Sequence, residues 1–214
     1  MRYADRKAAG GALAERLTHL AGHLDVIVLG LPRGGVPVAA AVAHKLKLPL
    51  DVLVVRKLGV PWHRELAMGA IAPSGVRVLQ DRIIKRAGVR PYEVEAVATK
   101  EAEELERQER AYRHDEPPLD LNDRIALIID DGLATGASML AAVRAARALG
   151  AKTVIAAAPV GAADTIKRIG AEADDVVIDI TPPELGAVGQ WYDDFRQVRD
   201  TEVLQALGRT RQTT

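Results

Sequence analysis

Short apolar segments alternate with longer segments whose apolar residues recur at helical spacing, and this alternation runs through most of the chain. The apolar segments predict buried strands at 25–30, from Leu50, and at 124–130, 152–160 and 174–180. Helical spacing begins between them, from Asp5, Val36, Gly136 and Asp164. Strands that alternate with helices predict an α/β fold, in which a parallel sheet is flanked by helices on both faces.

One part of the chain departs from this rhythm. Residues 65–72 and 76–80 have strand-like patterns separated by Pro73-Ser74-Gly75, and they predict a hairpin. Residues 81–114 are helical in pattern and highly charged, and Pro117-Pro118 ends them. We predict a single domain over 1–214 with a helical insertion over 81–118. A long charged helix is usually a solvated face, and a lid or a dimer contact is the alternative.

Composition narrows the classes of protein to consider. The 214 residues suffice for one domain, and the absence of cysteine excludes disulfides, thiolate metal sites and cysteine nucleophiles. The 29 basic and 29 acidic residues cancel and aromatic residues make up 3%, which argues against nucleic acid as a partner. No apolar stretch is long enough to cross a membrane, and the first residues are too polar for a secretory signal. We expect a cytoplasmic protein with a small-molecule site.

The stretch ALIIDDGLATGASM, residues 126–139, carries the strongest chemical signal. Asp130 and Asp131 end a predicted strand, where the turn at Gly132 lets both carboxylates face one cleft. Small residues then open a helix, so that backbone amides and the helix dipole form an anion site. Carboxylates that can bind sugar hydroxyls, next to a site that can bind phosphate, indicate a ribose 5-phosphate as the ligand. The acid pair alone would favour an ordinary strand end and helix cap, whereas the combination favours the sugar-phosphate site.

Two further turns carry basic residues. Pro32-Arg33-Gly34-Gly35 joins the first strand to its helix, and Arg56-Lys57 follows the second strand. Taken alone, the first is consistent with a tight turn and the second with a solvated strand end. A P-loop is excluded because no Gly-Lys-Ser/Thr follows a strand, and no G-x-G-x-x-G is present for a dinucleotide.

Four apolar residues, two acids and a Thr-Gly-x-Ser loop resemble the phosphoribosyl diphosphate (PRPP) motif of type I phosphoribosyltransferases, and the order of elements fits that family over most of the chain. The resemblance implies their fold. It also implies that Asp130 and Asp131 hold the ribose 2- and 3-hydroxyls. The residues expected to bind the 5-phosphate are Ala134, Thr135, Gly136, Ala137 and Ser138.

The basic turns fit the same resemblance. The turn at Arg33, Gly34 and Gly35 is similar to the Ser-Arg-Gly-Gly turn of bacterial xanthine-guanine enzymes, which implies pyrophosphate binding and a cis Pro32–Arg33 peptide. The Arg56-Lys57-x-Gly pattern resembles adenine phosphoribosyltransferases, where such residues contact the diphosphate. There a mobile loop follows, which would be Gly59 to Arg64 here.

The mobile loop brings two further candidates. Glu65 corresponds to the flexible-loop acid of the adenine enzymes and is a catalytic candidate. Trp62 belongs either to the loop or to a contact with a neighbouring subunit.

The acceptor is less defined by the resemblance. Ala134 stands where hypoxanthine-guanine enzymes have an aspartate, and Gly161 falls where they have a purine-binding lysine, so a 6-oxopurine is not implied. The tail over 180–200 resembles their C-terminal hood, because Val188 and Asp193 line up with it. In this tail, Trp191 and Tyr192 supply either a stacking face for the acceptor or packing of the hood.

The resemblance implies transfer of the 5-phosphoribosyl group from PRPP to a nucleobase or related nitrogen acceptor, with release of pyrophosphate. Mg²⁺ would be the cofactor, and Asp130 and Asp131 would hold it indirectly through ribose hydroxyls or water. We expect a role in nucleotide metabolism and a homodimer. The alternative is a PRPP-binding regulatory protein with little or no transferase activity, and a third hypothesis is a binding module without turnover.

Asp130→Ala is expected to lower turnover by roughly 10²–10³, about 3–4 kcal/mol, because the variant loses one contact made in the transition state. The measurement is the turnover of the purified variant with its true acceptor. Undiminished turnover would refute the role of Asp130.

Overall fold

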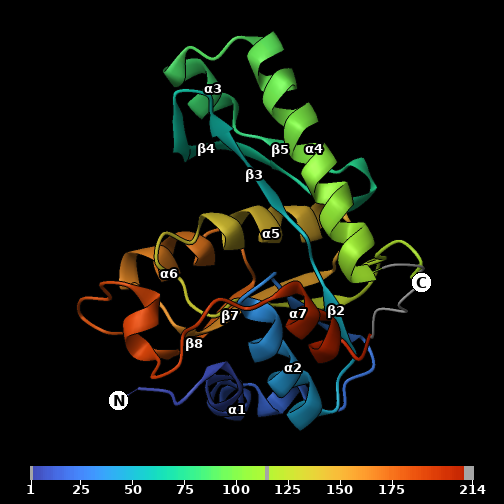
Figure 1. Cartoon of the computed structure of the whole chain (residues 1–214), viewed down its shortest axis with the longest axis vertical. Coiled ribbons are helices and arrows are strands. Elements are labelled where there is room, and N and C mark those ends of the chain that lie inside the picture. Colours follow the sequence, from blue (N-terminus) through green and yellow to red (C-terminus); the bar gives the residue numbers. More distant parts are fainter. Residues whose placement is uncertain (1, 114–115, 210–214) are drawn as a thin grey trace.

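A five-stranded parallel sheet forms the core of the lower part of the molecule (Figure 1). The structure is a computed structural model that describes residues 2–113 and 116–209, with the backbone alone at 65 and 74. In their order across the sheet, the strands are β2 (Leu50–Val52), β1 (Val26–Gly30), β6 (Ile125–Ile129), β7 (Thr153–Val160) and β8 (Asp175–Ile180). Every neighbouring pair is parallel, which confirms the predicted sheet.

Helices cover both faces of this sheet, as predicted. On one face lie α1 (Arg6–Arg16) and α2 (Gly35–Leu46), and on the other α5 (Ala137–Ala148) and α6 (Ala163–Gly170). In β6, Leu127 and Ile129 join the first layer while Ala126 and Ile128 join the second. A strand buried on both faces needs an unbroken apolar run, and this requirement explains why these strands could be predicted from the sequence.

Residues 56–113, which we call the upper lobe, form a second unit above the parallel sheet (Figure 1). Its antiparallel sheet consists of β3 (Arg56–Val60), β4 (His63–Ile71) and β5 (Arg77–Leu79), in that order. A short 3-10 turn, η2 (Pro73–Gly75), joins β4 to β5 and confirms the predicted hairpin. The helices α3 (Asp81–Ala87) and α4 (Pro91–Arg113) complete the lobe.

Three details of the upper lobe correct the sequence predictions. The strand from Leu50 ends at Val52, so Arg56 and Lys57 begin β3 of another sheet. The loop predicted over Gly59 to Arg64 is a β-hairpin instead, and its strands approach so closely that a Cβ at Gly59 would lie 2.5 Å from the Arg64 carbonyl oxygen. The predicted arm is two helices, because Gly88 ends α3 with a φ of +68°.

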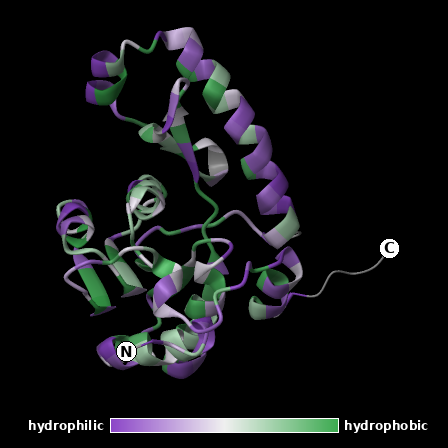
Figure 2. Cartoon of the chain, turned by 60° about the vertical axis from the view of Figure 1, so that its left-hand side comes forward, coloured by the Kyte–Doolittle hydropathy of each residue, from purple (hydrophilic) through white to green (hydrophobic). Residues whose placement is uncertain are grey.

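The long helix α4 is polar along most of its surface (Figure 2). Its buried positions include Val94, Ala98, Leu105 and Tyr112, which pack with the β3 and β4 side chains in one hydrophobic cluster. A helix with so narrow an apolar stripe is held by tertiary packing rather than by its own stability. Within the described ranges, no helix has both the length and the hydropathy needed to cross a bilayer.

The C-terminal tail returns to the N-terminus. It contains the 3-10 turn η3 (Val188–Trp191) and the helix α7 (Asp200–Ala206). The backbone of Tyr3 donates to Trp191 at 2.9 Å and accepts from Asp193 at 2.8 Å. Backbone hydrogen bonds therefore hold the predicted hood region against the first described residues of the chain.

A buried ion pair anchors the upper lobe to the parallel sheet. Asp51 in β2 and Arg113 at the end of α4 are 8% and 7% exposed, and Arg113 Nη2 lies 2.9 Å from Asp51 Oδ2. Arg209 adds a contact of 3.3 Å to Asp51 Oδ1. Removing one partner of such a group leaves a buried charge uncompensated.

Asp51→Ala is expected to lower the free energy of unfolding by about 3–5 kcal/mol, because Arg113 loses its buried partner. Chemical denaturation of the ligand-free protein measures the change. As a control, Glu106→Ala removes the exposed pair with Arg110 and should cost under about 1 kcal/mol. Equal losses in the two variants would contradict this assignment.

Candidate functional site

Two of the predicted motifs touch at one edge of the parallel sheet. Because β1 pairs with β6, the turn after β1 and the acids after β6 lie side by side at the carboxyl ends of the strands. A Cβ at Gly34 would lie 2.0 Å from Asp131 Oδ2, and one at Gly35 would lie 2.8 Å from the Asp130 Cα. The nearest neighbours of Gly35 are backbone atoms, so only glycine fits there, whereas a side chain at Gly34 would have to displace the Asp131 carboxylate. The Pro32–Arg33 peptide is cis, as predicted.

The loop from 134 to 138 opens α5 at the same edge of the sheet. Gly136 precedes the helix with a φ of +66°, and α5 begins at Ala137. The Thr165 hydroxyl donates to the Ala134 carbonyl at 2.6 Å, and Arg168 donates to the Thr135 carbonyl at 2.6 Å. The backbone amides of residues 134–138 donate to no acceptor within the described ranges. Free amides at a helix start are suited to an anion.

The two acids are partly buried. The Asp131 amide donates to Asp130 Oδ1 at 2.8 Å, which fixes the Asp130 carboxyl. Burial and the repulsion from Asp131 raise the pKa of Asp130 from 3.8 to about 7. Burial also raises the pKa of Asp131, and Arg6 opposes that rise.

Arg6 is a site residue that the sequence analysis missed. Its Nε and Nη2 atoms each lie 2.9 Å from Asp131 Oδ2, and its guanidinium lies 4.0 Å from the centre of the Phe195 ring. Asp131 Oδ1 keeps no hydrogen-bond partner within the described ranges, so it can still accept from a ligand. Arg6 begins a surface helix 125 positions before Asp131. No local pattern marks such a contact.

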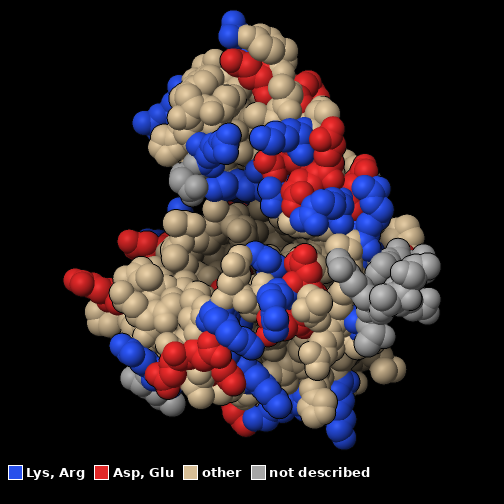
Figure 3. Space-filling model, viewed as in Figure 1, with Lys and Arg blue, Asp and Glu red and all other residues tan. Residues whose placement is uncertain are grey.

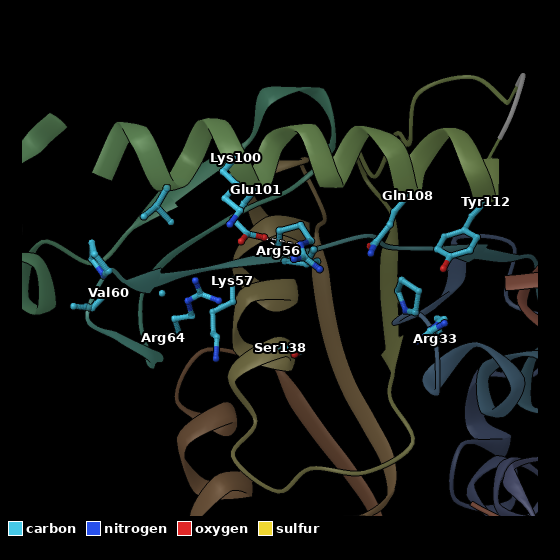
Figure 4. Close-up of a pocket in the computed structure, with 15 residues that line it drawn as sticks. Arg33, Arg56, Lys57, Val60, Arg64, Lys100, Glu101, Gln108, Tyr112 and Ser138 are labelled. Atoms are coloured by element: carbon cyan, nitrogen blue, oxygen red, sulfur yellow. Dashed lines mark hydrogen bonds and ion pairs between the residues drawn. The ribbon is translucent and has the colours of Figure 1, made fainter. Parts of the chain in front are cut away.

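A cavity of about 740 Å³ lies beside these motifs, between the parallel sheet and the upper lobe. Figure 3 shows Lys and Arg side chains above and below a hollow between the two parts of the molecule. The predicted residues Arg33, Arg56, Lys57 and Ser138 line the cavity. The upper lobe adds five polar side chains, which are Arg64, Lys100, Glu101, Gln108 and Tyr112 (Figure 4). Five basic residues against one acid favour an anionic ligand.

The family model described as "Phosphoribosyl transferase domain" matches residues 3–185. The chain belongs to this family. Two Mycobacterium tuberculosis proteins, each named "Putative phosphoribosyl transferase" (MT0597 and Rv0571c), are 49% identical to it over 205 residues. These residues cover 96% of the chain, and the chain spans about half the length of both relatives, 46%.

One solved structure is similar over nearly its whole length. The crystal structure of TT1426 from Thermus thermophilus has a TM-score of 0.85 and 38% sequence identity. The match covers 97% of this chain and 98% of that one. The arrangement of both sheets is therefore shared with an experimentally determined protein.

In this phosphoribosyl transferase domain, the four residues predicted to bind the acceptor differ in burial and in the atoms they contact. Val188 packs on Gly132, where a Cβ would lie 2.4 Å from Val188 Cγ1. Tyr192 is 4% exposed, and its hydroxyl donates to the Asp131 carbonyl at 2.6 Å, which favours hood packing over a stacking face. The Trp191 indole is partly buried and donates to the Leu185 carbonyl at 3.0 Å. Asp193 is exposed.

The predicted diphosphate residues on β3 have unequal surroundings. Arg56 is paired with Glu101 of α4, with Nη2 and Oε2 2.6 Å apart. No sequence pattern pointed to Glu101. Glu65 lies in β4, but its side chain is outside the described part of the structure, so its catalytic role stays a prediction. Trp62 is 60% exposed at the tip of the hairpin.

Asp130→Asn is expected to stabilise the ligand-free protein at pH 8 and to change its stability little at pH 4. The folded state retains the Asp130 proton between about pH 3.8 and 7, where the unfolded state has lost it, so wild-type stability falls through this window. The Asn side chain carries no charge, so its burial does not destabilise the folded state as pH rises. Its Oδ1 can still accept a hydrogen bond from the Asp131 backbone amide. The gain at pH 8 is on the order of 1–3 kcal/mol.

Thermal unfolding across this pH range measures the difference. Asp193→Asn serves as the control, because Asp193 lies exposed in the tail. Identical pH profiles for Asp130→Asn and the wild type would show that Asp130 carries no burial cost.

Proposed function

We propose that the protein transfers the 5-phosphoribosyl group from PRPP to a nucleobase or related nitrogen acceptor and releases pyrophosphate. The observation that carries this proposal is the contact between Gly34 and Asp131, which joins the proposed pyrophosphate turn to the proposed diol acids. The amides of 134–138, at the same edge of the sheet, would bind the 5-phosphate. The proposed sites for the pyrophosphate, the ribose hydroxyls and the 5-phosphate of PRPP are therefore adjacent.

The proposed mechanism is electrostatic. The acceptor nitrogen loses its proton to the solvent or the departing pyrophosphate and forms a bond to the anomeric carbon, while pyrophosphate leaves with the electron pair of the broken C–O bond. Positive charge develops on the ribose ring in the transition state. Asp130 and Asp131 would accept hydrogen bonds from the ribose hydroxyls, and Arg33 would bind the departing pyrophosphate. Groups fixed in advance around developing charge lower the barrier without reorganising during the reaction. The upper lobe would shield the ribose from water.

The site suits Mg²⁺ that is bound chiefly through the substrate. Asp130 and Asp131 offer the hard oxygen donors that this ion prefers. The described residues contain no group of three or more His, Cys, Asp or Glu side chains that could hold a metal. Asp130 and Asp131 would therefore hold the ion through ribose hydroxyls or water. When bound, it would supply neutralising charge to the leaving diphosphate.

Two observations favour the alternative, a PRPP-binding regulatory protein with little or no transferase activity. Arg6 already pairs with Asp131 Oδ2, and the raised pKa of Asp130 leaves part of its carboxyl protonated near neutral pH. Both effects weaken the acceptor strength of the acids toward a diol. The basic cavity would still bind the phosphates. Cytoplasmic location and a homodimer stay predictions.

The deciding experiment combines binding with turnover. PRPP and Mg²⁺ are added to the protein, PRPP binding is measured by calorimetry, and pyrophosphate release is followed with a panel of nucleobases. We expect PRPP to bind and pyrophosphate to appear with one class of base. Asp130→Ala is the matched control, because it should slow the release by roughly 10²–10³.

The other outcomes discriminate between the hypotheses. PRPP binding without release for any base would support the regulatory alternative. Absence of PRPP binding would reject both proposals.

A further inference from the structure

The helix α4 presents two adjacent stripes of side chains to the rest of the molecule. Val94, Ala98 and Leu105 pack into the hydrophobic cluster of the upper lobe. Beside them, Glu101 and Gln108 face the cavity, since residues at helical spacing share one side of a helix. Figure 4 shows α4 above the cavity, with its polar side chains directed toward Arg33, Lys57 and Ser138 below. The arm that the sequence left unexplained thus forms a wall of the candidate site.

The position of α4 relative to the pyrophosphate turn is fixed by polar contacts at its end. The Tyr112 hydroxyl donates to Asp200 Oδ1 at 2.7 Å, and Arg33 Nη1 lies 3.9 Å from the same oxygen. The buried pair of Arg113 with Asp51 follows one residue later. A helix held in this way keeps its side chains at a defined place above the cavity.

The charges on this wall are not equally available. Glu101 pairs with Arg56, and this pairing offsets the charge of a residue predicted to bind the diphosphate. Lys100, the preceding residue, also lines the cavity and forms no ion pair or hydrogen bond within the described ranges. Its side chain is exposed to the cavity opening. Lys100 is therefore a cation available to a ligand.

We propose that this face of α4 is the second wall of the substrate site and that Lys100 binds the diphosphate of PRPP. The inference rests on the proposed function. The 5-phosphate has its own group of free amides at 134–138, whereas the more highly charged diphosphate faces an Arg56 that Glu101 partly neutralises. An ammonium on a flexible stem suits a phosphate whose position shifts as the bond to the sugar breaks.

The test compares ligands that carry one group or the other. Calorimetry with Mg²⁺ present measures the binding of inorganic pyrophosphate, PRPP and ribose 5-phosphate. Lys100→Ala is expected to weaken pyrophosphate and PRPP binding by about tenfold, the loss of one charge-assisted hydrogen bond. Ribose 5-phosphate should bind as it does to the wild type. Lys100→Arg should recover part of the affinity, because it keeps the charge.

Arg110→Ala is the matched control, since it removes a cation of the same helix that is 73% exposed and pairs only with Glu106 among the described residues. It should leave all three affinities unchanged. Unaltered pyrophosphate and PRPP binding by Lys100→Ala would overturn the inference while the proposed function stands. Equal weakening of ribose 5-phosphate and pyrophosphate would overturn the assignment to the diphosphate. Absence of PRPP binding by the wild type would instead defeat the proposed function itself.

Discussion

The close approach of a glycine turn to a pair of acids is the constraint on which the site depends. Gly34 and Gly35 bring the backbone after β1 against Asp130 and Asp131, and a side chain at Gly35 would collide with backbone atoms. This contact follows from the pairing of β1 with β6, which sets two strand ends next to each other. The parallel sheet therefore builds the site as a consequence of its own register.

Placing two carboxylates in this partly buried corner has an electrostatic cost. Burial raises the pKa of both acids, and their mutual repulsion adds to the rise for Asp130. Arg6 offsets part of the cost by pairing with Asp131, while the aromatic ring of Phe195 packs against its guanidinium. The N-terminal helix and the C-terminal tail meet at this arginine. Both ends of the described chain thus contribute to the surroundings of one acid.

The upper lobe adds a second set of charges to the same site. Its anchor is the buried pair of Asp51 and Arg113, and Tyr112 links it through Asp200 to the turn at Arg33. Between these anchors and the hairpin, α4 covers a cavity that is rich in basic residues. The family resemblance predicted a mobile loop here, whereas the structure has a hairpin and a helix.

Patterns of adjacent residues predicted the parallel sheet and the loop before α5, and the family resemblance implied the turn at Arg33 with its cis peptide. Each of these is written in adjacent residues, such as the apolar run of β6 followed by Asp130 and Asp131. The sequence also predicted helix over 81–114, of which His114 lies outside the described residues, but not which face of α4 is used. The pairing of Arg6 with Asp131, the pairing of Glu101 with Arg56 and the packing of Tyr192 became visible in the folded structure. These partners lie 125, 45 and 61 positions apart in the chain.

Local patterns record how a segment packs with its own neighbours, because helix and strand periods extend over a few residues. Contacts between distant segments depend on where the whole fold places them.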